Sequence, residues 1–440
     1  MLGSGRIAQA VLAPRAHLLR GTRLLSTSRA AGARKAGASA PDRTSSTAFV
    51  KKKKATVKVP RSGTATSVNM SEANPRYYAP APEVDLVDLD VSTASDGSVG
   101  KMVGLSGRLI DQGSFPGSLG ADFKLFGRPA LLYRKDTQDL VNRLLSHTGR
   151  GTAAPTTVLS GKAGSGKSVE LFKVASVAAS TNAIVLYVPS TIAWVDSSQP
   201  YAPLDNGMYA QLEVVLDLLQ KVSQMNRVVL AQVPLGKELA IGKKKLAADS
   251  TLADLVDYGL QVPSLGHEVL EALLDIASSQ TVVPFVIALD EVNTFWNRSQ
   301  YRDQNDNVLP ARRLRLVNAL LPFFDGSKQV ASGWVLGAVS YSNMRFMDKK
   351  FGERLSPPPK VHMANPMLAR DTNVLAPAAL PFAQHEVDRL TPAEAWALMG
   401  FYHQTSIARA PPTRPSVAKT WIMADGNPRD FFSGVTAFFY

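Results

Sequence analysis

The chain has 440 residues, of which 45% are hydrophobic and none is cysteine, so it is long enough for two or three domains with a sizeable core. The lack of cysteine excludes disulfides, thiolate zinc sites and cysteine nucleophiles, and six scattered histidines offer no metal-ligand spacing. The net charge is +13, and no apolar run is long enough to span a bilayer.

The excess positive charge lies within the first 61 residues. They contain 14 Lys and Arg against one acid, Asp42, whereas residues 62–440 contain 35 basic and 35 acidic side chains. The body of the chain is therefore neutral on average, and we expect it to contact RNA only through local patches.

Residues 1–35 predict a mitochondrial transit peptide, because they are rich in Arg, Ala, Leu and Ser and contain no acid. Arg23 precedes Ser26 at a spacing that resembles a matrix-peptidase cleavage site. A disordered basic tail is the alternative. A secretory signal is disfavoured because arginines interrupt the apolar stretch.

Residues 36–122 predict an N-terminal extension that is first basic and then flexible. The run from Lys51 to Lys54 suits contact with RNA phosphates, although such runs are also found simply solvated or as nuclear-import signals. From about residue 62 to about residue 120 the chain is rich in Ser, Gly, Asp and Pro, which indicates an extended arm.

Residues 123–385 predict an α/β domain. Its first clear element is a helix that Asp136 can cap, with an apolar face of leucine and valine, ending before Gly149. The β-branched, apolar residues 156–159 predict a buried strand, and the spacing of apolar residues over 168–179 predicts a helix.

Between that strand and that helix, residues 161–168 read GKAGSGKS, a complete G-x-x-x-x-G-K-[S/T] phosphate-binding loop. Gly161, Gly164 and Gly166 allow successive N–H groups to face phosphate oxygens at a helix N-terminus. An accidental glycine-rich turn is the alternative, and the strand-helix context disfavours it.

Lys167 is expected to reach the β- and γ-phosphates, and Ser168 to offer its hydroxyl to Mg²⁺. The other residues of the loop that we expect to contact the nucleotide are Ala163, Ser165 and Val169.

Residues 183–188 predict a second buried strand, and the apolar period over residues 207–222 predicts a helix. Residues 228–282 are predicted to form a mostly helical insertion. Lys243, Lys244 and Lys245 make a local basic patch within it, for which a solvated face is the default interpretation.

Residues 284–291, PFVIALDE, predict a central strand buried on both faces, whose C-terminal end is where parallel sheets bind ligands. Asp290 is expected to hold Mg²⁺ through water, and Glu291 is suited to orienting or deprotonating an attacking water. A core strand followed by a helix N-cap is the alternative. The Asp-Glu pair is typical of the additional-strand ATPases, and no N-K-x-D guanine-reading motif occurs.

Residues 312–321 predict a helix and residues 333–339 a third strong strand. Asn343 follows that strand and is a candidate sensor of the γ-phosphate, with ordinary turn chemistry as the alternative. Residues 356–381 contain three successive prolines and predict a loop.

Residues 386–440 predict a small, mainly helical C-terminal domain. Thr391-Pro392-Ala393-Glu394 is a capping box with proline at the first helical position, and it opens a helix through about residue 403. Residues 426–429, GNPR, form a tight turn from which Arg429 would reach the nucleotide; a plain surface turn is the alternative.

The leader, the basic arm, GKAGSGKS, the acidic-ended strand and the GNPR turn together resemble the death-associated protein 3 family, the P-loop component of the mitochondrial ribosomal small subunit. The resemblance covers residues 123–440. It implies an AAA-like α/β fold and a GTP-binding, or more generally purine-nucleotide-binding, ribosomal protein in the head of the small subunit. The motif residues carry over to Gly161, Gly164, Gly166, Lys167, Ser168 and Asp290.

Two classes of function follow. In the first, GTP, GDP or ATP with Mg²⁺ is a structural or regulatory cofactor, hydrolysis is slow or absent, and the partners are small-subunit rRNA, ribosomal proteins and large-subunit bridge elements in the mitochondrial matrix. The alternative is a free matrix P-loop ATPase of the signalling or remodelling kind. No arginine finger can be identified at Arg345, Arg354 or Arg370, so a self-assembling ring is not expected.

Overall fold

The computed structural model describes residues 84–94, 96–148, 152–340 and 381–436. The transit peptide, the lysine run at residues 51–54, Asn343 and nearly all of the predicted loop at 356–381 lie outside these ranges, so they stay predictions.

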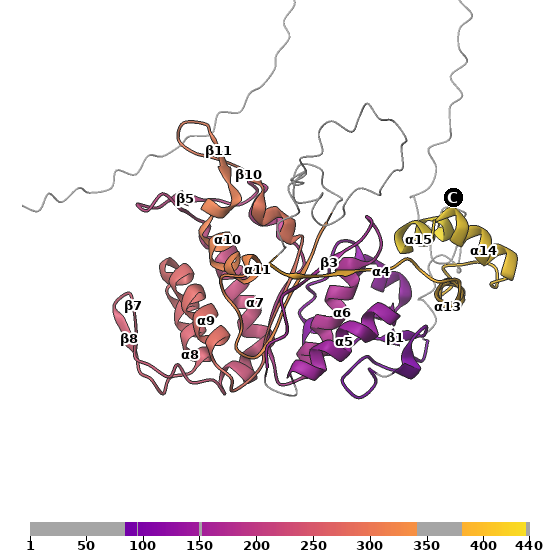
Figure 1. The fold of residues 1–440 in the computed structure, drawn as a ribbon, viewed down its shortest axis with the longest axis horizontal. Helices are drawn as coiled ribbons and strands as arrows, with labels where there is room; N and C mark the ends of the chain where they lie inside the picture. Colours follow the sequence, from indigo (N-terminus) through magenta and orange to yellow (C-terminus); the bar gives the residue numbers. More distant parts are fainter. Residues whose placement is uncertain (1–83, 95, 149–151, 341–380, 437–440) are drawn as a thin grey trace, which may run out of the picture. The chain divides into compact units, whose positions relative to one another are not determined.

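A five-stranded parallel sheet forms the centre of the described chain, in the order β13-β3-β12-β9-β4. Figure 1 shows one of its strands, β3, near the middle of the ribbon. Its strands are β3 (Thr157–Ser160), β4 (Ile184–Val188), β9 (Phe285–Asp290), β12 (Gly333–Ala338) and β13 (Ala383–Glu386). Every residue of the first four is buried, as their continuous apolar runs require. The strands predicted at residues 156–159, 183–188, 284–291 and 333–339 are therefore confirmed.

Helices cover both faces of this sheet. Alternate residues of each strand point to opposite faces, and both sets of side chains are buried. Val185, Val286 and Leu336 pack into the core that contains α5 (Lys135–Thr148) and α6 (Lys167–Ser180). Their neighbours Ile184, Ile287 and Val335 pack into the opposite core. That core contains α7 (Leu212–Leu230), α8 (Leu252–Gln261), α9 (Gly266–Ser279), α10 (Arg315–Leu320) and α11 (Pro322–Asp325).

The flexible N-terminal extension predicted for residues 36–122, with its extended arm to about residue 120, is wrong from residue 84 onward. This segment contains η1 (Asp96–Ser98), β1 (Met102–Gly104), α3 (Arg108–Asp111) and the start of α4 (Leu119–Phe126), and β1 pairs antiparallel with β2 (Ala130–Leu132). Leu89, Leu105 and Leu109 are buried in the same core as α6. The Arg108 guanidinium donates to the carbonyl oxygens of Ala179 at 2.9 Å and Met225 at 3.0 Å. The apolar residues of this segment come in short groups, such as Leu86-Val87 and Leu109-Ile110, separated by polar residues and glycine, and the sequence analysis did not assign them to a core.

The connection between β4 and β9 differs in detail from its prediction. The helix expected at residues 207–222 begins only at Leu212, because Tyr209–Ala210 is strand β6, paired with β5 (Ala202–Pro203). The insertion predicted over residues 228–282 is mostly helical as expected, through the end of α7, α8 and α9. It also contains an unpredicted hairpin, β7 (Leu239–Ile241) and β8 (Lys244–Leu246), whose turn carries Lys243. The remaining short elements here are η2 (Ile192–Trp194) and η3 (Pro263–Leu265).

The segment after β9 is more broken than predicted. It contains η4 (Val292–Trp296), the hairpin β10 (Arg298–Arg302) and β11 (Val308–Pro310), and η5 (Ala311–Arg313). The helix expected over residues 312–321 is divided between η5 and α10, because Leu314 between them has an extended backbone. A separate helix, α11, starts at Pro322, whose missing N–H disfavours a continuous helix from α10.

The predicted capping box at Thr391 is confirmed. Thr391 N donates to Glu394 Oε2 at 2.7 Å, and Glu394 N donates to Thr391 Oγ1 at 3.2 Å, at the start of α13 (Pro392–Gln404). The chain continues with α14 (Arg414–Met423) and α15 (Pro428–Thr436). Helix α4 packs on this region through Phe126, whose ring centroid lies 5.4 Å from that of Phe401.

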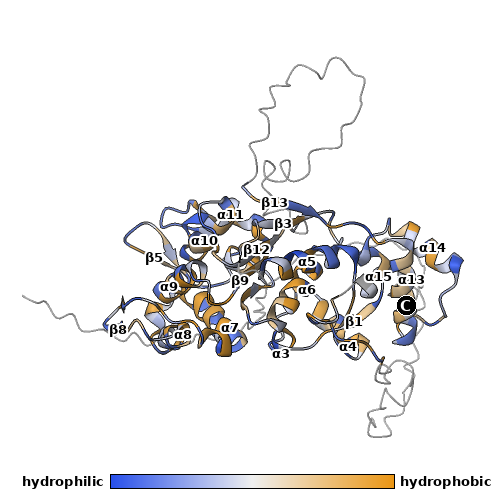
Figure 2. Ribbon diagram, turned by 60° about the horizontal axis from the view of Figure 1, so that its bottom comes forward, coloured by the Kyte–Doolittle hydropathy of each residue, from blue (hydrophilic) through white to orange (hydrophobic). Residues whose placement is uncertain are grey.

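The edge strand β13 was missed by sequence analysis. Its residues, AQHE, are mostly exposed and appear hydrophilic in Figure 2, unlike the apolar strands beside it. It is held by parallel backbone pairing to β3, from Ala383 opposite Thr157 to Glu386 opposite Ser160. Backbone pairing leaves no trace in the hydropathy pattern of an edge strand.

We expect His267 to make the protein acid-sensitive. Its Nε2 accepts a hydrogen bond from Gln211 N at 3.1 Å, and burial, with Arg315 adding, lowers the pKa of the buried imidazole to about 4. Between pH 6.5 and 4 the unfolded chain takes up a proton that the folded chain refuses, so stability falls with pH by about 3 kcal/mol. Urea unfolding at pH 7 and pH 5 should show a smaller loss for His267→Gln than for the wild type; equal losses would contradict this origin.

Candidate functional site

The glycine-rich loop at residues 161–168 connects β3 to α6, with Gly166 as the N-cap of the helix. Gly161, Gly164 and Gly166 all have positive φ, at +134°, +81° and +101°. A Cβ at Gly166 would meet nothing within 4 Å, so the backbone conformation alone favours glycine there. At Gly164 a Cβ would lie 2.6 Å from Asn427 Oδ1, so glycine also permits close approach.

Five successive carbonyl oxygens of the loop accept hydrogen bonds from other groups of the protein. Lys167 Nζ donates to those of Gly161 and Lys162, at 2.8 and 2.7 Å. Asn427 Nδ2 donates to Ala163 O at 2.7 Å, Arg429 N to Gly164 O at 3.4 Å, and Arg134 Nη1 to Ser165 O at 3.4 Å. Peptide C=O and N–H groups point in opposite directions, so this arrangement suits a loop whose N–H groups bind an anion.

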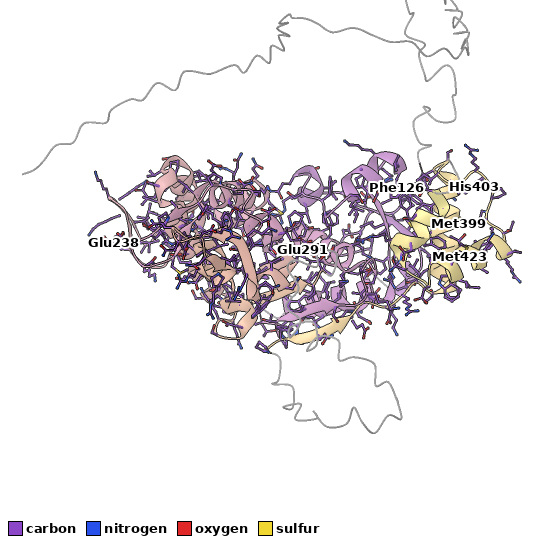
Figure 3. All side chains as sticks on the ribbon, turned by 90° about the horizontal axis from the view of Figure 1, so that it is seen from above. Phe126, Glu238, Glu291, Met399, His403 and Met423 are labelled. Atoms are coloured by element: carbon purple, nitrogen blue, oxygen red, sulfur yellow. The ribbon has the colours of Figure 1, made fainter. Side chains whose placement is uncertain are left out.

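A cavity of about 300 Å³ adjoins the loop. One part of its lining comes from the loop and from polar or charged residues around it: residues 163–169, Arg134, Glu170, Lys173, Ser340 and Arg429. The other part is apolar and comes from the N-terminal segment and the C-terminal helices: Met102, Leu119, Phe126, Leu131, Leu398, Tyr402 and Phe432. Figure 3 shows Phe126 beside the C-terminal helices, where its ring contacts those of Tyr402 and Phe432. Such a cavity can take a ligand that is anionic at one end and flat and apolar at the other.

Asp290 ends β9 and is 4% exposed. Burial raises the pKa of its carboxyl to about 7, and the Glu291 carboxylate adds to this, whereas a hydrogen bond from Ser168 opposes it. Burial also lowers the pKa of Lys167 to about 8, although the Asp290 charge opposes that shift. Asp290 lies outside the lining of the cavity, to which Ser168 connects it.

Glu291 contacts Ser190, which lies in the segment that follows β4. It adopts φ +64°, and Ser190 Oγ donates to its Oε2. Burial raises the pKa of its carboxyl, and the bond from Ser190 opposes that shift. Glu291 is not among the residues that line the cavity, so its catalytic role stays a prediction. Asn343, the other predicted γ-phosphate contact, lies outside the described residues.

Oxygen donors for a hard cation are present at Ser168 and Asp290. Within the described ranges no cluster of three or more His, Cys, Asp or Glu residues could hold a metal ion by itself. Mg²⁺ usually binds through one or two carboxylates together with water and ligand phosphates, and this donor pair fits that pattern. In the same described part of the chain, no helix has the length and apolarity to cross a membrane.

A buried charge cluster behind the loop was missed by sequence analysis. Asp136, expected to cap α5, instead lies inside its first turn, 3.4 Å from Arg134 Nη2. Lys173 Nζ donates to Glu170 Oε1 at 2.8 Å and to Thr137 Oγ1 at 2.6 Å. The only sequence signal was the i,i+3 spacing of Glu170 and Lys173, which is also typical of a solvated helix face.

A comparison with protein families supplies an identity for this fold. The family model described as mitochondrial ribosomal death-associated protein 3 matches residues 131–434. That range includes the glycine-rich loop, Asp290 and Arg429.

Three curated relatives also match, each named small ribosomal subunit protein mS29. The protein of Schizosaccharomyces pombe is 24% identical over 361 residues, which cover 78% of this chain and 72% of the relative. Those of Mus musculus and Bos taurus are 22% and 23% identical, over 50% and 49% of this chain and 56% and 54% of their own lengths. The family model matches well over half of the residues of this chain, so the chain belongs to the mitochondrial ribosomal death-associated protein 3 family.

Proposed function

We propose that this protein is a component of the small subunit of the mitochondrial ribosome, located in the mitochondrial matrix, and that it binds a purine nucleotide with Mg²⁺. Family membership and the name shared by the three relatives support the ribosomal role. The partners we propose are small-subunit rRNA and ribosomal proteins, with elements of the large-subunit bridges.

The proposed nucleotide binding rests on the geometry of the glycine-rich loop. Its carbonyl oxygens accept hydrogen bonds from protein donors, and the loop adjoins a cavity that is apolar on one side. In this proposal the domain is a P-loop NTPase domain of AAA-like architecture. The N–H groups of residues 163–168 bind the phosphates, and Lys167 exchanges its two carbonyl partners for phosphate oxygens. The apolar part accommodates the nucleoside.

Ser168 and Asp290 would hold Mg²⁺, the latter through water. When bound, the ion neutralises phosphate charge beside the carboxylate and so favours the ionised form of Asp290. Arg429 approaches from the start of α15, where it lines the cavity and its charge acts on Lys167. The nucleotide we propose is GTP, GDP or ATP. The base stays open because the sequence contains no N-K-x-D guanine-reading motif.

The alternative is a free matrix ATPase, which the Asp290-Glu291 pair at the end of β9 favours. Two observations weigh against it. The Glu291 carboxylate is hydrogen-bonded by Ser190 and Ser340 and does not itself line the cavity, and no arginine finger is identifiable in the sequence. We therefore expect slow or undetectable hydrolysis.

We expect the tagged full chain, expressed in mitochondria, to sediment with the small ribosomal subunit and to retain bound purine nucleotide after purification. Gradient fractionation and analysis of the extracted nucleotide measure the two halves of the proposal separately. A protein that stays at the top of the gradient, turns over at the rate of a motor ATPase and loses turnover on Glu291→Gln would favour the enzyme instead.

A further inference from the structure

The buried side chain of Arg134 joins the glycine-rich loop to the chain that leads into the C-terminal helices. Arg134 is 5% exposed and directly precedes α5. Its Nη1 donates to Ser165 O at 3.4 Å, its Nη2 to Asp388 O at 2.8 Å and Arg389 O at 3.0 Å, and its Nε to Glu394 Oε1 at 3.3 Å. One guanidinium therefore contacts the loop, the segment after β13 and the first turn of α13.

The contact with Glu394 reaches the cap of α13. While one carboxylate oxygen of Glu394 accepts from Arg134, the other accepts from Thr391 N at 2.7 Å. Arg134 therefore contacts Glu394, whose capping box with Thr391 fixes where α13 begins. The carbonyl oxygens next to Ser165 in the loop are held by the C-terminal residues themselves, Ala163 O by Asn427 and Gly164 O by Arg429 N.

The charges around Arg134 require a cation at this position. Asp136, Glu170 and Glu394 place carboxylate oxygens within 3.4, 3.9 and 3.3 Å of the guanidinium, and all three side chains are buried. Lys173 contacts only Glu170 among these three carboxylates. Three buried carboxylates need more than one positive neighbour, since an unpaired buried charge is strongly destabilising.

Geometry adds a requirement for arginine rather than lysine. The acceptors lie on several sides of Arg134, and a guanidinium carries five N–H donors in a rigid planar fork. A lysine places its three donors on one atom, so it can supply the charge without reaching the loop and the C-terminal chain together.

We propose that Arg134 is a positioning residue that couples ligand binding at the glycine-rich loop to docking of the C-terminal residues 388–404. The inference rests on the proposed binding of a purine nucleotide. Because coupling is reciprocal, docking of residues 388–404 raises nucleotide affinity and nucleotide strengthens docking.

The test compares the full chain with Arg134→Lys and Arg134→Met, titrated with MgGDP and with MgADP by calorimetry. Hydrogen exchange of peptides from 161–168 and 388–404 is measured with and without saturating nucleotide. We expect both variants to bind more weakly by about 5- to 150-fold, the usual range of such coupling. Nucleotide should still slow exchange in 161–168 but no longer in 388–404.

Arg134→Lys separates positioning from folding, since it keeps the charge among the three carboxylates; it carries the test if Arg134→Met fails to fold. Arg128→Gln is the matched control, because Arg128 lies in the same segment but pairs with Asp88, at 2.6 Å. Wild-type affinity together with wild-type nucleotide-induced protection of 388–404 in Arg134→Lys would overturn the inference alone. Failure of the wild type to bind either nucleotide would overturn the proposed function and the coupling with it.

Discussion

Lys167→Ala should reduce nucleotide affinity by about 10- to 150-fold and lower thermal stability and incorporation into the small subunit together. Loss of the ammonium removes the charge aimed at the phosphates, and a single such charge-assisted contact is typically worth about 1.5–3 kcal/mol. A ligand that binds only the folded chain adds about 2.7 kcal/mol at a hundredfold excess over its Kd, and the variant forfeits this increment.

Melting curves with and without MgGDP or MgADP, together with gradient sedimentation, measure the three quantities. Lys162→Ala is the matched control, because its side chain belongs to the same loop but is 67% exposed and pairs with Asp425. That control should bind nucleotide as the wild type does, since exposed ion pairs contribute little. If Lys167→Ala abolishes binding while melting temperature and incorporation stay at wild-type values, the nucleotide has no structural role.

Gly164→Ala should separate the C-terminal residues from the loop. The new Cβ would lie 2.6 Å from Asn427 Oδ1 and 3.1 Å from Arg429 Cβ, on a backbone with φ +81°. Left-handed backbone alone costs a non-glycine residue about 1–3 kcal/mol, and displacement of the Asn427 contact adds to that. We therefore expect the free energy of unfolding to fall by about 2–4 kcal/mol and nucleotide affinity to fall with it.

Gly166→Ala separates the two causes of this loss, the strain of a left-handed backbone and the displacement of Asn427. Its φ of +101° imposes comparable backbone strain, but the added Cβ meets nothing within 4 Å. Urea unfolding should show the larger loss for Gly164→Ala, and Asn427→Ala introduced into that variant should recover part of it. Equal losses for the two glycine variants would mean that the approach of Asn427 has no energetic weight.

The sequence predicted those parts of the fold whose signal is local. Strands β3, β9 and β12 are continuous apolar runs, and the capping box at Thr391 and the glycine-rich loop are contained in a few residues each. The direction of Glu291 was not predictable in this way, because it depends on a left-handed backbone and on the partner Ser190 in the segment after β4.

Arg134 illustrates the limit of local patterns most clearly. Nothing in its neighbours distinguishes it from a surface arginine before a helix, and its partner Glu394 lies 260 positions further along the chain. The edge strand β13 and the packed residues 84–122 were missed for the same reason, since pairing and burial that depend on distant residues leave no regular hydropathy pattern.

The donor to Ala163 O, Asn427, stands 264 positions after its acceptor. Contacts between residues so far apart in the sequence slow folding, because a long stretch of chain must lose conformational entropy before the contact can stabilise it. The full set of carbonyl contacts in the glycine-rich loop therefore requires the chain through at least residue 429. A chain cut anywhere before Asn427 lacks the donor to Ala163 O, so a distant truncation should alter a loop whose own residues are all present.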